Sequence, residues 1–377
     1  MYREKRDIRR VPATILVAIA ALPVIVGLLL SGCTTQSSTT ASGGGAASRG
    51  ASGRAAQDYP EWYLNPQSVY PDNTYLTAIG TGDSRRDAEQ QALSSLSQIF
   101  EAQVSVDSRQ SERYRELMTS QGTMTETEVQ LADTTSIKSD QTLLNVQFGE
   151  AAVDDSGRVH VIAYLERLPT ARVYRDLISR NGRQVERFLA EADLKAGGRD
   201  DLIREYSYVM AAAVVADSNE VLLDQLNIIA PGMGQTVQLP YVYDRVLQRR
   251  ADLSSTMGVS VSVAGDDKGR VTAILRQALS EERLPIVESD PVLQVRGAVR
   301  IEAIPSNAEF KSVRWTLNLD MTSRDGRSLV NYDEENRASG ISEEAARAFA
   351  YRDIEKAVAR NFVESMLSYF NGVVLGR

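Results

Sequence analysis

Residues 74–100 read TYLTAIGTGDSRRDAEQQALSSLSQIF, and they decide how the first folded region is built. Thr74–Ile79 has the aromatic and β-branched content of a strand, and Gly80-Thr81-Gly82 breaks it. Asp83 or Ser84 then offers a helix N-cap. From there apolar residues recur at helical spacing, at positions 88, 92, 96, 99 and 100. The stretch therefore predicts a strand, a glycine turn and an amphipathic helix.

Gly80-Thr81-Gly82 also has the position of a phosphate-binding turn, between a strand and a helix. No third glycine follows at dinucleotide-binding spacing, and no Gly-Lys-Ser/Thr follows either. Pro231–Gly234 is likewise a loop without a lysine beside it. We therefore interpret the first glycines as a turn that needs glycine backbone angles, and we expect no cofactor.

Aromatic residues and prolines crowd the segment just before this strand. Its members are Pro60, Trp62, Tyr63, Pro66, Tyr70, Pro71 and Tyr75. Tyrosine and tryptophan are favoured at interfaces, but a small domain also uses them in its core, and we favour core packing. Trp62, Tyr63, Tyr70 and Tyr75 are nevertheless our candidates for a contact surface.

Three further stretches of this region have strand character, at 103–106, 143–148 and 158–165. The last follows a hairpin-type turn at Asp154-Asp155-Ser156-Gly157. Residues 107–141 are polar and fit either a pair of strands or a helix followed by a strand. The only histidine, His160, shares a strand face with Ile162 and Tyr164, which favours a structural or surface role.

The middle of the chain is helical in pattern from Thr170 to about Leu226. The spacing predicts a first helix that continues past Asn181-Gly182, a second from about 199 to 216 and a short third around 221–226. We expect them to form helical hairpins.

The last third alternates strands and helices. Strands are predicted at 259–263, 293–304, 312–321 and 328–332, with a helix at 271–282. Ser342 caps a final helix whose apolar residues recur every four positions. The whole pattern predicts an α+β fold, with two small antiparallel-sheet and helix lobes joined by a helical hairpin segment.

The N-terminus has the pattern of an export signal. Five basic residues precede an uncharged apolar run at 11–30, and Leu30-Ser31-Gly32-Cys33 follows. These four residues resemble the lipobox of bacterial lipoproteins, which implies cleavage after Gly32 and lipid on Cys33, the only cysteine. A permanent membrane helix is the alternative, since the run has about the length of a span.

Residues 34–57 are Ser, Thr, Ala and Gly with little else, which predicts a flexible tether. A coil of that length reaches roughly 25–30 Å. Thr34 after the cysteine resembles the sorting pattern for the outer membrane. The mature chain carries a net charge near −11 after residues 1–32 leave, which argues against nucleic-acid binding.

Few residues suit catalysis. One histidine allows no cluster of two, and Cys33 is consumed by lipid. Acidic pairs occur at 154–155, 266–267, 281–282 and 343–344, in predicted turns and helix ends. We therefore expect no enzyme activity, no catalytic residue and no metal site.

Pro60–Tyr63, Tyr75–Gly82 and Ala88–Ala92 resemble, in this order, the lipoprotein-20 family of envelope lipoproteins. Arg167–Leu189 is similar to the helix after that module in larger relatives. The resemblance covers about 58–190 and implies an exported, membrane-anchored domain of envelope or flagellum-associated proteins, without catalytic residues. The last lobe loosely resembles periplasmic lipoproteins of cell-wall regulation and secretion, in element order.

These observations divide the chain into a signal peptide (1–32), a lipidated tether (33–57), a lipoprotein-20-like domain (58–168), a helical connector (169–250) and a second α+β domain (251–377). We expect a lipoprotein of the outer membrane that faces the periplasm and acts as a non-enzymatic scaffold with envelope protein partners. The alternatives are a hydrolase of peptidoglycan or carbohydrate and a flagellar-base accessory.

Overall fold

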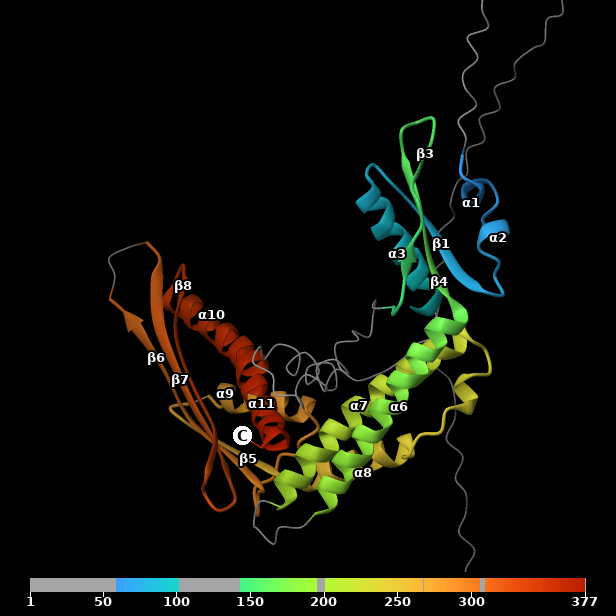
Figure 1. The fold of residues 1–377 in the computed structure, drawn as a ribbon. Coiled ribbons are helices and arrows are strands. Elements are labelled where there is room, and N and C mark those ends of the chain that lie inside the picture. Colours follow the sequence, from blue (N-terminus) through green and yellow to red (C-terminus); the bar gives the residue numbers. More distant parts are fainter. Residues whose placement is uncertain (1–58, 102–142, 195–200, 267, 306–308, 377) are drawn as a thin grey trace, which may run out of the picture. The chain divides into compact units, whose positions relative to one another are not determined.

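The computed structural model describes residues 59–101, 143–194, 201–266, 268–305 and 309–376. Over these residues the chain is an α+β protein with two four-stranded sheets and a pair of long helices between them in sequence (Figure 1). The expected fold class is confirmed. The signal segment, Cys33, the tether, the predicted strand at 103–106 and the segment 107–141 lie outside the described residues.

The first sheet is antiparallel, with the order β1-β4-β2 and with β3 also paired to β4. Its strands are β1 (Tyr75–Gly82), β2 (Gln147–Phe148), β3 (Ala152–Val153) and β4 (Val159–Glu166). One face packs on α3 (Arg85–Glu101) and α6 (Arg167–Asp193). The segment of α1 (Glu61–Leu64) and α2 (Pro66–Val69) packs on the other face, where Trp62 meets Ile162.

The predicted glycine turn is wrong, because Gly80, Thr81 and Gly82 are the last three residues of β1. Neither glycine has a positive φ. A Cβ on Gly80 would lie 2.1 Å from the carbonyl oxygen of Ala88 and 2.2 Å from the nitrogen of Ala92. Glycine is therefore required where the backbone of α3 lies directly on β1. Ser84 caps α3, since its Oγ accepts the Asp87 N–H at 3.2 Å.

The second and third helices predicted in the middle of the chain are one helix, α7 (Asp201–Ile229). The residues between the two predicted helices, 217–220, are polar, but their buried members have partners. The Asp217 carboxylate lies 3.6 Å from Arg250 and accepts the Tyr243 hydroxyl at 2.8 Å. The Asn219 amide donates to the Ile178 carbonyl at 3.1 Å. Buried polar groups with such partners do not end a helix.

A short 3₁₀ turn, η1 (Gly234–Thr236), and α8 (Tyr243–Thr256) follow α7. Val246 and Leu253 of α8 pack in the same cluster as the second sheet. Ala251, where we expect the second domain to begin, lies inside α8. The domain boundaries stay predictions.

The second sheet has the order β5-β6-β7-β8. Its strands are β5 (Val259–Ala264), β6 (Leu293–Ile304), β7 (Lys311–Ser323) and β8 (Ser328–Gly340). β5 runs parallel to β6 and the other pairs are antiparallel, so the sheet is mixed and not purely antiparallel as expected. The parallel pair arises because α9 (Arg270–Glu281) is a crossover between β5 and β6.

β8 is eight residues longer than the predicted strand at 328–332. The added residues are mostly polar, and the sequence pattern did not mark them as strand. Their side chains bind across the sheet: Glu335 lies 3.3 Å from Arg314, Ser339 bonds Ser312 at 2.8 Å, and Asp333 accepts the Asn318 amide. Such cross-strand pairs stabilise a strand without apolar alternation.

The C-terminal helix consists of α10 (Glu343–Lys356), a π-helical segment η2 (Ala357–Phe362) and α11 (Val363–Leu375). Its buried side chains lie four residues apart, at 346, 350, 354, 358, 362, 366 and 370. A four-residue repeat drifts about 40° per step on an α-helix of 3.6 residues per turn. The wider π turn moves the repeat back, so one stripe of side chains stays on the sheet.

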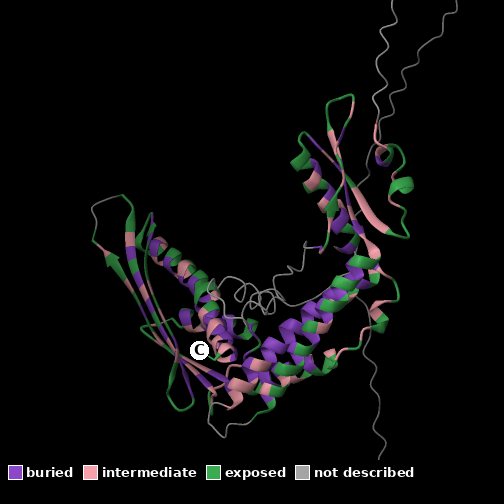
Figure 2. Cartoon of the chain, viewed as in Figure 1, coloured by how far each residue is buried: buried purple, intermediate pink, exposed green. Residues whose placement is uncertain are grey.

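Buried residues, shown in purple in Figure 2, form two large clusters and a small one by their contacts, which the picture itself does not separate. The largest surrounds Trp315 of β7 and includes residues of α7, α9, α10 and α11. The second joins β1, β4 and α3 to α6 and to the end of α7. The third lies under the aromatic segment, between Trp62, Ala152 and Ile162.

Candidate functional site: the tyrosine face

The strand register places four pairs of residues on the face of the first sheet opposite α3. Tyr75, Thr77, Ile79 and Thr81 of β1 lie opposite Glu166, Tyr164, Ile162 and His160 of β4. The aromatic segment before β1 adds Tyr63 and Tyr70 to the same face. We call Tyr63, Tyr70, Tyr75, Tyr164 and His160 the tyrosine face. His160, Ile162 and Tyr164 share a strand face as predicted.

Three tyrosines of this face contact one another. The ring centroids of Tyr70 and Tyr164 are 4.8 Å apart, those of Tyr70 and Tyr75 5.3 Å, and those of Tyr75 and Tyr164 5.9 Å. The Tyr164 hydroxyl donates to Gln147 at 3.0 Å. Burial, and then the neighbouring Tyr164, raises the pKa of Tyr70. The trio is a rigid, half-buried aromatic surface with hydroxyl groups, the composition that protein contact surfaces favour.

Trp62 differs from the three tyrosines among the candidate contact residues, because it is 5% exposed and packs on Ile162. Its neighbour Tyr63 is half-buried and lies between Tyr59, at 5.0 Å, and the His160 ring, at 4.9 Å. The accessible part of the surface is therefore made by the tyrosines, and Trp62 fixes the segment that carries them.

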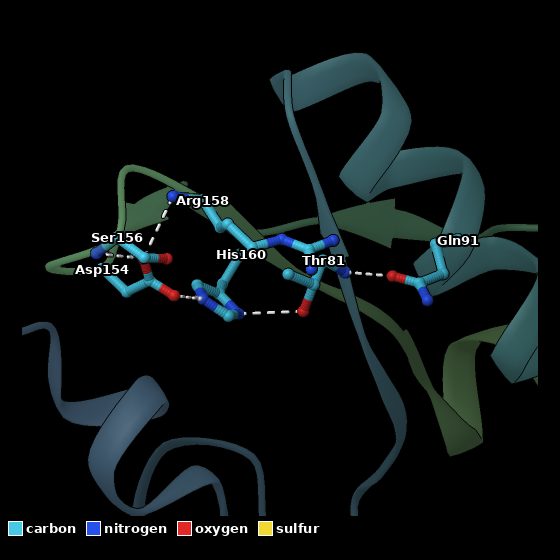
Figure 3. Close-up of polar contacts among 6 residues, drawn as sticks. All are labelled: Thr81, Gln91, Asp154, Ser156, Arg158 and His160. Atoms are coloured by element: carbon cyan, nitrogen blue, oxygen red, sulfur yellow. Dashed lines mark hydrogen bonds and ion pairs between the residues drawn. The ribbon is translucent and has the colours of Figure 1, made fainter.

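His160 lies at the centre of a hydrogen-bond network (Figure 3). Its Nε2 is 2.8 Å from the Asp154 carboxylate, and its Nδ1 is 3.0 Å from the Thr81 hydroxyl. Asp154 also accepts from Ser156 and from the Arg158 N–H across the hairpin turn. The Ser156 hydrogen bond, followed by that of His160, holds the pKa of Asp154 well below its usual range.

The two ring nitrogens of His160 have different partners. A carboxylate accepts only, so Nε2 donates to Asp154, and the Thr81 hydroxyl is the partner of Nδ1. The network joins the β3–β4 turn to β1, and the ring supports Tyr63. It thus fixes the aromatic segment against the sheet.

Carboxylate, imidazole and hydroxyl follow one another here as they do in acyl-transfer triads. Thr81 lies within β1, however, and its N–H is bound by the side chain of Gln91. That N–H is therefore not free to stabilise a developing oxyanion. The sequence pattern missed this network because Thr81 and His160 are 79 residues apart. The Asp154–His160 pair, six residues apart around the predicted turn, could have been found.

Other acidic residues serve local structure. Asp266 accepts the N–H and hydroxyl of Thr272, and Glu343 binds Arg347 at 2.9 Å. Within the part of the chain that the structure describes, no three His, Cys, Asp or Glu residues gather as a metal site would need.

A cleft of about 860 Å³ lies on the second sheet, over β6, β7 and β8. Its charged side chains bind one another: Arg314 lies 3.3 Å from Glu335, and Arg300 lies 3.6 Å from Glu302. Asn318 donates to Asp333 beside them. The cleft is therefore a polar, internally paired surface.

Residues 60–166 match the family model described as LPP20 lipoprotein. The match spans the aromatic segment, β1, α3 and β4, and it confirms the resemblance expected from their motifs. The match supports a lipoprotein of the cell envelope as the class of protein to which residues 60–166 point.

Two solved structures are similar at low identity. A minor lipoprotein from Acinetobacter baumannii is 11% identical, with a TM-score of 0.25, over 30% of this chain and 94% of its own. A secreted protein from Helicobacter pylori is 12% identical, with a TM-score of 0.36, over 78% of this chain and 98% of its own. No curated protein matches the sequence. None of the helices in the described residues has the length and apolar character to cross a membrane.

Proposed function

We propose that the chain is an outer-membrane lipoprotein whose body, tethered through Cys33, presents the tyrosine face to a protein of the envelope. The observation that carries the proposal is the tyrosine face, a set of half-buried tyrosines with mutual ring contacts and a fixed support. The lipobox and Thr34 support the anchor and its membrane, and the tether gives the body reach.

A scaffold role accounts for the His160 network better than catalysis does. Thr81 lies within β1, and its N–H is already bound by the side chain of Gln91. A hydrolase built on this network would use Thr81 as its nucleophile. Thr81→Val should leave the envelope function intact, and loss of a peptidoglycan-cleaving activity in purified Thr81→Val protein would favour the hydrolase.

The anchor is tested by fractionation and mass measurement of wild type and Cys33→Ser. We expect the wild type in the outer membrane with an N-terminus at acylated Cys33, and we expect Cys33→Ser to keep residues 1–32. If the wild-type and Cys33→Ser proteins had equal masses apart from the oxygen-for-sulfur change, the lipid anchor would be refuted.

The contact surface is tested with a photocrosslinking residue at Tyr75. We expect a discrete adduct with one envelope protein, lost in the Tyr70→Ala background. The same residue at Phe349, which is 42% exposed on α10, is the control. An identical adduct from both positions, or none from Tyr75, would refute a partner at the tyrosine face.

A further inference from the structure

Among the described residues β1 is an edge strand, since it pairs with β4 alone. The Gly149 N–H donates to the Ile162 carbonyl, so Ile162 turns its backbone groups away from β1. Ile79 is opposite Ile162, and in an antiparallel pair it then turns its own groups away from β4. Alternate residues of a strand direct their backbone groups to the same side. The N–H of Thr81, two residues after Ile79, accordingly binds the side chain of Gln91 on α3 and not β4. Thr77 and Ile79 thus direct their N–H and C=O groups to the open edge.

The edge lacks the features that keep strands from pairing. Tyr75–Gly82 contains no charged residue and no proline, and its register with β4 is unbroken. The edge strand of the second sheet, β8, carries Asp333, Glu335 and Arg337 instead. Charges and prolines are the usual protection of a sheet edge, so β1 is an open template for another strand.

Apolar side chains border the open position on both faces of the sheet. Ile79 is 40% exposed on the tyrosine face, whereas its partner Ile162 is fully buried. On the other face Ala78 is half-buried although its partner Ala163 is fully buried. A strand beside β1 would cover these groups.

We propose that the edge of β1 binds an extended peptide segment of the partner protein, which joins the first sheet as a further strand. The backbone groups of Thr77 and Ile79 bind its main chain, and small or β-branched side chains of the peptide meet Ile79 on one face and Ala78 on the other. The proposal rests on the partner role proposed above and specifies how that partner is held.

A second copy of the chain does not fit this edge. The contacts at Gly80 place α3 directly on β1. Two copies paired through β1 would bring their α3 helices to about one strand spacing, roughly 4.8 Å, whereas packed helices need about 8–10 Å. The ligand is therefore a strand without a helix of its own above it.

Hydrogen exchange of the full mature chain tests whether the edge is open. We expect the amides of Thr77 and Ile79 to exchange about 100-fold faster than those of Ala78 and Gly80, which bond to β4. Equal protection of all four amides in the isolated protein would show that the chain itself covers the edge, and it would overturn the proposal.

Peptide binding tests the recognition. The probe is a peptide of three threonine–valine repeats with a lysine at each end, and its control is the same peptide N-methylated at every backbone amide. We expect the first to bind and to slow exchange at Thr77 and Ile79, and the second not to bind. Absence of binding at millimolar concentration, or equal binding of both peptides, would overturn the proposal.

Two variants at one position separate the backbone from the side chain. Thr77→Pro removes the outward N–H but leaves the bonds to β4, and it should weaken binding about tenfold. Thr77→Val keeps that N–H and should bind as the wild type does. Equal affinity of the two variants would contradict main-chain recognition. A failed membrane anchor would leave these results unchanged, so the two proposals fail separately.

Discussion

Asp154 shows how one carboxylate holds several parts of the first sheet. Its oxygens accept from Ser156, Arg158 and His160, and through His160 the network reaches Thr81 of β1. The turn, the central strand and the edge strand therefore depend on the ionised form of this one side chain.

Asp154→Asn should lower the free energy of unfolding of the domain at neutral pH. It should also make that free energy change less as the pH falls. The pKa of Asp154 is lowered by folding, so the ionised carboxylate stabilises the fold fully above its ordinary value of 3.8 and progressively less below it. Denaturant unfolding from pH 7 to pH 2 should show the wild type losing its advantage below about pH 4. A constant difference between the two proteins over that range would contradict this role.

Gly80 and Gly372 should respond in opposite ways to alanine. Gly80→Ala places a methyl group against the backbone of α3 and should cost about 3 kcal/mol or more. Gly372 lies in α11 with nothing within 4 Å of its Cβ position, so Gly372→Ala should stabilise by roughly 0.5–1 kcal/mol. Urea unfolding measures both, and equal effects would refute the close approach of α3 to β1.

At the scale of elements, the π-helical segment keeps a four-residue repeat on one face of the C-terminal helix. Removing one residue from such a segment restores α geometry and preserves the register on both sides. Removing one residue from a regular helix rotates everything beyond it by about 100°.

Deletion of Arg360 should therefore be milder than deletion of Ala348 in α10. Both residues are exposed, so neither deletion removes a core side chain. We expect the second deletion to cost at least about 2 kcal/mol more, as thermal unfolding of the two variants would show. A similar loss of stability from both deletions would mean that the π-helical segment does not keep the four-residue repeat on one face of the helix.

Most elements of the fold follow from local pattern. The alternation at Leu293–Ile304 and the cap at Ser342 appear in the structure as predicted, because their patterns belong to their own elements. The local sequence pattern gave a wrong prediction where contacts between residues far apart in the sequence determine the secondary structure. Asp217 needs Arg250 and Tyr243 to stay inside α7, and residues 333–339 need β7 to be a strand.

The candidate site divides in the same way. Strand alternation places His160 beside Tyr164, and the aromatic crowding marks the segment that covers them. The link from His160 to Thr81 depends on the pairing of strands 79 residues apart, which one sequence does not reveal. The role of Gly80 depends on the approach of α3, whereas the sequence suggested only a turn.

At the scale of the whole molecule, α7 contributes to both large clusters. Leu222 and Leu226 pack with the first sheet, and Tyr206 to Ala216 pack with the second. A helix shared by two cores couples their unfolding, because neither core is complete without it.

The two tryptophans allow this coupling to be measured, since Trp62 lies by the first sheet and Trp315 in the core of the second. Trp62→Phe and Trp315→Phe each leave one fluorescent reporter. Leu222→Ala should cost about 2–5 kcal/mol and lower the urea midpoint of both reporters. A shift confined to Trp62 would show that the two sheets unfold independently.

The distance along the chain between β1 and β4 also governs the order of assembly. β1 contacts α3 through neighbouring residues, but Thr81 meets His160 only after 79 further positions have been made. The entropy of closing that loop is lost before the sheet gains any pairing energy, which is typical of slow, high contact-order folding. Because the chain is synthesised from its N-terminus, β1 emerges long before the strand that completes its sheet, and until then both of its edges are unpaired.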